Sequence, residues 1–184
     1  MYNNAVIDVA AGSCLAVSGV TQIIGSNTVS KTGPGLLRFT GDPNHRSVFI
    51  VAEGTGELQH GGSTDAPWFI SPGATLRDLT VNDIGDYLVQ NAGTLDLQVS
   101  EGIGGLNGAA SGLITNGAAS AIPLTIGNNN QSGAYAGAIR NGAGAIAVTK
   151  TGTGIQTLAG ASTYSGTTTL SGGQLNINNA SAIG

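Results

Sequence analysis

Residues 150–160 read KTGTGIQTLAG and residues 31–41 read KTGPGLLRFTG, so one sequence frame occurs twice in this chain. The C-terminal copy continues as ASTYSGTTTL over residues 161–170 and as SGGQLNI over residues 171–177. The two copies begin 119 residues apart, at Lys31 and Lys150, which is about six turns of a coil at about 20 residues per turn. Self-similarity on this scale predicts a repetitive stacked fold that acts through its length and surface.

This frame resembles the autotransporter-associated β-strand repeat, which occurs in the passenger regions of proteins secreted by the type V route. The resemblance is close over residues 133–184 and partial over residues 13–62. The N-terminal copy departs from the pattern after Gly41, where residues 44–47 do not match their C-terminal counterparts. In the C-terminal copy, Gln156 stands where the family usually has leucine. The resemblance implies an extracellular or cell-surface protein of the outer membrane of a Gram-negative bacterium.

The composition also indicates a narrow coil. The 184 residues include 31 glycines, only 9% are charged and 4% are aromatic, whereas ordinary soluble domains have about 25% charged residues. The hydrophobic share of 40% supplies a core of mostly small aliphatic side chains. Many glycines and a thin aliphatic core suit an elongated solenoid better than a globule.

Short runs with alternating polarity predict strands. These runs cover residues 5–9, 47–51, 94–99, 124–126 and 174–178. In the third run, Leu95 and Leu97 fall on one face and Asp96 on the other. A glycine precedes leucine repeatedly, at Gly12, Gly56, Gly73, Gly93 and Gly173, and we expect the following Leu15, Leu58, Leu76, Leu95 and Leu175 to point inward and stack from coil to coil. Asn128, Asn129 and Asn130 are interpreted as turn residues that tolerate left-handed φ angles.

We therefore predict an all-β fold, a right-handed parallel β-helix of about nine coils. At about 4.8 Å per coil the rod is about 43 Å long. Residues 1–184 form one β-helix segment, which we expect to be a section of a longer passenger. The signal peptide and the membrane translocator would then lie outside this segment, and the membrane would be contacted only through that translocator.

Several side chains are of types that could carry chemistry. Asp78, Asp83 and Asp86 lie near Arg77 and suit a calcium site or the acids of a polysaccharide lyase or hydrolase, but solvated loop acids are the favoured interpretation. His45 and His60 lie in turn sequences rather than beside a catalytic partner. We accordingly predict no catalytic, cofactor-binding or metal-binding residues, and no enzyme activity.

Other side chains have structural interpretations as well. Cys14 is the only cysteine, so it forms no internal disulfide, and the alternation places it outward. Trp68 and Phe69 are expected to pack in the core or at its shoulder, with exposure for glycan stacking as the alternative. Thr167, Thr168 and Thr169 do not recur on the other copy, which disfavours an ice-binding threonine array.

Three functions remain open. The first is a non-enzymatic passenger stalk or adhesin, whose host or matrix glycan or protein ligand is unknown. The second is a filament subunit that self-associates end to end through open β-helix edges. The third is a carbohydrate-active β-helix such as a lyase or tailspike. Nucleic acid is not an expected partner, because the net charge is −4 and the six basic residues are scattered.

Overall fold

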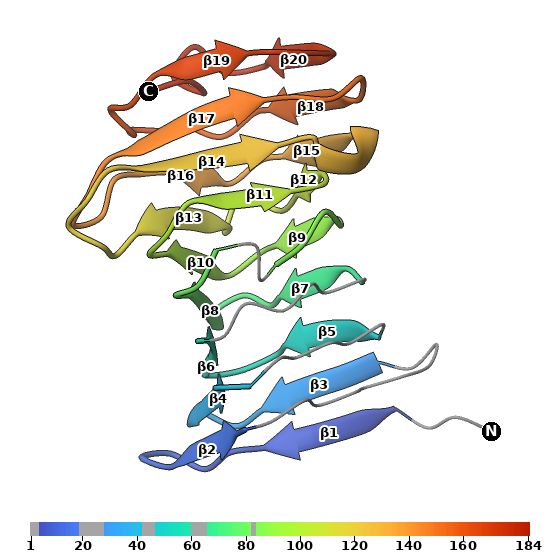
Figure 1. Ribbon diagram of the computed structural model, residues 1–184, viewed down its shortest axis with the longest axis vertical. Helices are drawn as coiled ribbons and strands as arrows, with labels where there is room; N and C mark the ends of the chain where they lie inside the picture. Colours follow the sequence, from blue (N-terminus) through green and yellow to red (C-terminus); the bar gives the residue numbers. More distant parts are fainter. Residues whose placement is uncertain (1–3, 19–27, 42–46, 60–65, 82–83) are drawn as a thin grey trace.

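Short parallel strands stack in coils along the longest axis of the molecule, from β1 (Ala5–Asp8) at one end to β20 (Gln174–Ile177) at the other (Figure 1). This computed structural model describes residues 4–18, 28–41, 47–59, 66–81 and 84–184. Every pairing between the described strands is parallel. The fold is a β-solenoid of about eight turns, which confirms the predicted all-β parallel architecture, while the hand of its winding stays a prediction.

Two sheets run through the N-terminal coils. Sheet 1 contains β1, β3 (Thr28–Thr32), β5 (Val48–Val51), β7 (Trp68–Ile70), β9 (Val89–Asn91) and β12 (Leu106–Asn107). Sheet 2 contains β2 (Cys14–Val17), β4 (Leu36–Phe39), β6 (Thr55–Leu58), β8 (Thr75–Asp78), β10 (Thr94–Leu97), β13 (Leu113–Asn116) and β16 (Ala138–Ile139). Each coil there contributes one strand to each of these sheets.

The later coils add two further sheets. Sheet 3 contains β11 (Glu101–Ile103), β14 (Ile122–Ile126), β17 (Ile146–Lys150) and β19 (Thr168–Leu170). Sheet 4 contains β15 (Gly133–Tyr135), β18 (Ile155–Leu158) and β20. A coil with a third strand needs more residues: Leu113 pairs with Ala138, whereas Leu76 pairs with Leu95. The prediction of about nine coils was therefore slightly too high.

The two copies of the repeated frame lie on different sides of the coil. Residues 31–41 turn the chain from β3 of sheet 1 into β4 of sheet 2, whereas residues 150–160 turn it from β17 of sheet 3 into β18 of sheet 4. The frame thus specifies a strand, a corner and a second strand. It does not mark a fixed position on the circumference, so 119 residues is not a whole number of coils.

Inward side chains form ladders through the core. One ladder in sheet 2 runs through Leu37, Leu76, Leu95, Ile114 and Ile139, all of them fully buried. Each such side chain contributes about 1.5–3 kcal/mol of transfer free energy, before the loss of conformational entropy is subtracted. The burial of these side chains is as expected from the alternating runs, and we expect the ladders to supply most of the favourable free energy of folding.

The predicted leucine stack is correct for Leu76 and Leu95 and wrong for Leu58. Leu58 pairs with Asp78, and the residue opposite Leu76 is Gly56. Both Gly56 and Leu58 face inward, two residues apart on β6, so the glycine occupies the ladder position that sequence spacing gave to leucine. Leu15 and Leu175 lie on strands near the two ends of the stack and are only partly covered.

Glycine makes the tight corner of the repeated frame possible. Gly33 and Gly152 have φ angles of 74° and 65°, a left-handed conformation that costs other residues energy. The next corner glycine, Gly35, faces the coil below, where a Cβ atom would lie 2.3 Å from the carbonyl oxygen of Ala10. The corners therefore require glycine both for backbone conformation and for close stacking. Asn129 and Asn130, in the 3-10 turn η1 (Asn128–Asn130), also have positive φ angles, as predicted.

Candidate functional site

Of the three acids chosen from sequence, the structure describes Asp78 and Asp86, which lie in different surroundings. Asp78 is fully buried in sheet 2, where its strand pairs with β6 and β10. Asp86 is exposed, and its carboxylate accepts a hydrogen bond from the Asn128 side chain at 2.8 Å. Asp83, like His45 and His60, lies outside the described residues. Among the residues that the structure does describe, no group of three or more His, Cys, Asp or Glu side chains is placed to hold a metal ion.

Trp68 belongs to the core, as the favoured interpretation held. It is 1% exposed, and its ring lies 4.9 Å from that of Phe49, which in turn packs edge-on against Phe39 at 5.6 Å. Phe69 follows on the same strand and is half-buried on the outer face of sheet 1. Cys14 is exposed, which confirms its predicted outward position.

The lysine of each repeated frame is buried at its corner. Lys31 donates hydrogen bonds to the carbonyl oxygens of Thr32 at 2.9 Å and Gly33 at 2.5 Å. Lys150 donates to the carbonyl oxygens of Thr151 and, at 3.3 Å, Gly152. Burial lowers the pKa of both lysines, and for Lys31 the nearby acids Asp8 and Glu53 oppose that change. These lysines close the corners from inside, so they are not available to a ligand.

A row of alternating charges crosses the outer face of sheet 2. Arg38 Nε lies 2.6 Å from Glu57 Oε1, Arg77 Nη1 lies 3.2 Å from Glu57 Oε2, and Arg77 Nε lies 3.1 Å from Asp96 Oδ2. We call Arg38, Glu57, Arg77 and Asp96 the charge ladder. The hydrogen bond to Asp96 is the main reason that the pKa of Arg77 is raised. Each charge is matched by its neighbour, so the ladder holds four coils in register and offers no unbalanced charge.

Sheet 1 and sheet 4 meet at an interrupted pairing, which we call the seam. The two sheets are joined there by a bridge between Gly108 and Tyr135. Gln156 spans the interruption from inside: its amide nitrogen donates to Leu106 O at 2.8 Å, and its oxygen accepts from Leu106 N at 3.2 Å. A Cβ atom on the intervening Gly133 would lie 2.7 Å from the Gln156 oxygen. The buried carboxamide thus takes the place of a neighbouring strand's peptide group.

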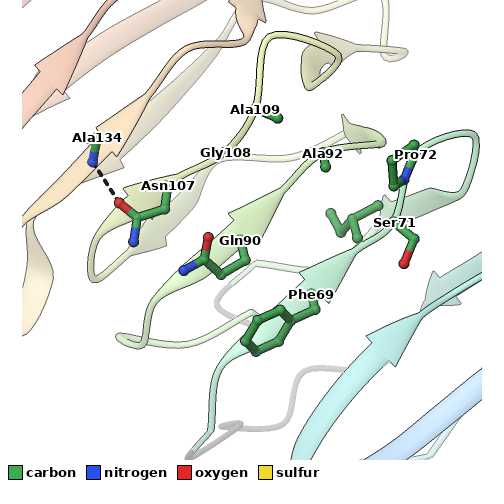
Figure 2. Close-up of a pocket in the computed structure, with 10 residues that line it drawn as sticks. Phe69, Ser71, Pro72, Gln90, Ala92, Asn107, Gly108, Ala109 and Ala134 are labelled. Carbon is green, nitrogen blue, oxygen red and sulfur yellow. Dashed lines mark hydrogen bonds between the residues drawn. The ribbon is translucent and has the colours of Figure 1, made fainter.

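On the outside of the seam, sheet 1 carries an open groove of about 510 Å3. Phe69, Gln90 and Asn107 occupy the same register position on β7, β9 and β12 and project side by side into it (Figure 2). The groove is completed by small or rigid residues: Ser71, Pro72, Ala92, Gly108, Ala109 and Ala134, with Ile70 behind them. This site was not predicted from the sequence, because Gln90 and Asn107 belong to no recognisable motif. They become neighbours only through the register of the coils.

Comparison with known proteins identifies the C-terminal copy of the frame. Residues 148–177 match the family model described as the passenger-associated-transport-repeat. No curated protein and no solved structure matched the chain. The family match confirms the resemblance drawn from the sequence and, with the solenoid fold, fits the passenger β-helix of an autotransporter. Such a passenger is secreted or displayed at the cell surface. No helix in the described part of the chain is long and apolar enough to cross a membrane.

Proposed function

We propose that this chain is a non-enzymatic stalk section of an autotransporter passenger, displayed beyond the outer membrane of a Gram-negative bacterium. The observation that carries the proposal is a parallel stack of about eight coils in which residues 148–177 match the passenger-associated-transport-repeat. At about 4.8 Å per coil, the stack spans about 38 Å. A rod of this kind holds whatever precedes it at a set distance from the membrane.

The roles of the polar side chains support a structural function. Glu57 and Asp96 are bound to arginines of adjacent coils, and Gln156 is committed to the backbone of Leu106. Catalytic acids need free carboxyl groups within reach of a substrate. The acids of the charge ladder instead use their oxygens to hold coils together.

A display experiment tests the proposal. The chain is placed between a signal peptide and an outer-membrane translocator in a Gram-negative host, with an epitope tag before Met1. We expect antibody to reach the tag on intact cells, and the stacked coils to resist mild protease treatment. The matched variants are Leu95→Asp, which buries a charge in the core ladder, and Thr94→Asp, which changes the outward neighbour. The first should lose protease resistance and the second should keep it.

Two results would contradict the proposal. One is retention of the folded wild-type chain in the periplasm, where antibody cannot reach the tag. The other is release of reducing ends when the purified chain is incubated with a panel of bacterial and plant polysaccharides, which would favour the carbohydrate-active alternative. Adhesion and end-to-end self-association both remain predictions. Electron microscopy over a concentration series distinguishes discrete rods from fibres.

A further inference from the structure

We propose that the groove on the outer face of sheet 1 binds an uncharged oligosaccharide. Its three projecting side chains offer an aromatic ring and two carboxamides in consecutive coils (Figure 2). Carboxamides both donate and accept hydrogen bonds, which suits sugar hydroxyls. An aromatic face suits the apolar face of a sugar ring. The volume of about 510 Å3 falls in the range of about 300–1,000 Å3 that is usual for small-ligand sites.

The charge distribution selects a neutral ligand. None of the residues that line the groove is charged. On the outer face of the neighbouring sheet 2, the arginines and carboxylates of the charge ladder are paired with one another. An anionic polysaccharide would bring its carboxylates or sulfates to a groove whose lining residues include no cation to neutralise them. A neutral sugar chain has no such cost of removing charge from water.

Gln90 is the side chain best placed to contact the ligand. It is half-buried, and its carboxamide makes no hydrogen bond within residues 4–18, 28–41, 47–59, 66–81 and 84–184. The carboxamide oxygen of Asn107 is already engaged, because it accepts a hydrogen bond from Ala134 N at 2.6 Å. The Asn107 NH2 group still faces the groove beside Gln90 (Figure 2). The site therefore offers one complete carboxamide and a second donor.

The backbone of the groove disfavours an extended peptide as the occupant. β7 pairs with β5 and β9, and β9 pairs with β7 and β12. Peptides that bind to sheets commonly add a strand to an unpaired edge, where main-chain hydrogen bonds provide the affinity. β12 lies at the end of sheet 1, but this edge is already occupied. Leu106 N and O bond the Gln156 side chain, and Gly108 N and O bond Ala134 and Ala136. Recognition must come from side chains, and the alanines and Gly108 leave room for a flat ring to approach them.

The inference goes beyond the stalk function and is tested on the purified chain, so it does not depend on how the chain is displayed. The probes are cellohexaose, maltohexaose, chitohexaose and mannohexaose, with hexagalacturonate as the anionic comparison. Binding is followed by the side-chain NH2 signals of Gln90 and Asn107 in 15N-resolved NMR spectra. We expect at least one neutral hexasaccharide to shift these signals saturably, and hexagalacturonate to leave them unchanged.

Variants separate the groove from the rest of the surface. Gln90→Ala should weaken binding about tenfold, the equivalent of one hydrogen bond to the ligand. Phe69→Leu should also weaken it about tenfold, while it keeps a side chain of similar volume at this half-buried position. The control is Ser30→Ala, which lies in the same outward-facing row of sheet 1 as Phe69 but two strands away from it. It should bind as the wild type does. Thermal unfolding of each variant confirms that the coils remain stacked.

Four outcomes would overturn the inference. The first is that no neutral hexasaccharide shifts the signals saturably at millimolar concentration, and the second is that the Gln90→Ala and wild-type chains bind with equal affinity. The third is that hexagalacturonate binds more strongly than the neutral sugars. The fourth is that an uncharged Ser-Val-Ser-Val-Ser peptide saturates the same signals while the sugars do not shift them. The last result would assign the groove to a protein partner. None of these results bears on whether the chain reaches the cell surface.

Discussion

The two copies of the repeated frame form the same corner in two different surroundings. In each, a buried lysine donates hydrogen bonds to the corner carbonyls, and a glycine takes a left-handed φ angle, at Lys31 and Gly33 in the first copy and at Lys150 and Gly152 in the second. The shared residues of the frame are therefore those that build the corner. They say little about what lies on either side of it.

The copies differ at the second residue of the strand that follows the corner. Leu37 is fully buried between Leu15 and Gly56 in a sheet whose backbone is paired on both sides. Gln156, in the equivalent place, is 1% exposed and bonds to the backbone of Leu106 across the seam. The comparison teaches that the strands of the neighbouring coils, and not the corner itself, decide whether this inward position is apolar or polar.

The largest expected effect comes from putting the second copy's residue into the first. Leu37→Gln should lower the free energy of unfolding by on the order of 3–5 kcal/mol, because it loses the burial of a leucine and buries an amide without a partner. Leu36→Gln, at the half-buried outward neighbour, should cost less than about 1 kcal/mol. Urea unfolding followed by circular dichroism measures both. Equal losses for the two variants would show that the inward ladder is not what stabilises sheet 2.

The reverse change should cost less. Gln156→Leu gains apolar burial but leaves the N–H and C=O groups of Leu106 without partners, and we expect a net loss of about 1–3 kcal/mol. Hydrogen exchange should show faster exchange of the Leu106 amide proton. The control is Ile155→Gln at the exposed neighbouring position, which should leave that proton protected. Unchanged protection of Leu106 in Gln156→Leu would mean that the seam closes without the carboxamide.

The strands could be predicted from the sequence because alternation and corner glycines are local signals. The runs at residues 48–51, 94–97 and 174–177 are strands in the structure. The predicted stacking of Leu58 on Leu76 was wrong because β6 has two inward positions, and Gly56 occupies the one that continues the ladder. Spacing alone does not distinguish these positions. The added third strand of the later coils was missed for a related reason, since it changes coil length without changing the local pattern.

The polar sites were harder to predict. The charge ladder leaves a sequence signal, because Arg38, Glu57, Arg77 and Asp96 alternate in sign at intervals of one coil, and a search at that spacing would find it. Gln156 was noticed only as a departure from the family pattern. Its role depends on Leu106, 50 residues earlier, and on an interruption between sheets that no local pattern reveals. Non-local register is what the sequence alone could not supply.

We expect the charge ladder to give the first copy a salt sensitivity that the second lacks. A double-mutant cycle with Arg38→Met and Glu57→Gln should give a coupling free energy of about 0.5–1 kcal/mol at low ionic strength, since the arginine side chain is 35% exposed. That coupling should shrink in 1 M NaCl through screening. Thr157 takes the place of Arg38 in the second copy, and the effect of Thr157→Val should not change with salt. Coupling that persists undiminished in 1 M NaCl would contradict a screened ion pair.

The smallest effect sharpens the comparison through its pH dependence. Tyr135, beside the seam, is 1% exposed, and its hydroxyl accepts a hydrogen bond from Asn91 Nδ2 at 3.2 Å. Burial raises the pKa of Tyr135 above its ordinary value of 10.0, against the smaller opposing influence of Asn91. The folded chain then holds this proton more tightly than the unfolded chain, so the contribution of the Tyr135 hydroxyl to stability is complete below pH 10 and is lost as the pH rises above 10.

Tyr135→Phe should cost about 0.5 kcal/mol at pH 8 and progressively less above pH 10. Urea unfolding between pH 8 and pH 11 measures the difference, in which the titration of Lys31 and Lys150 cancels. A difference that does not change with pH would show that the Tyr135 hydroxyl ionises as readily in the folded chain as in the unfolded one.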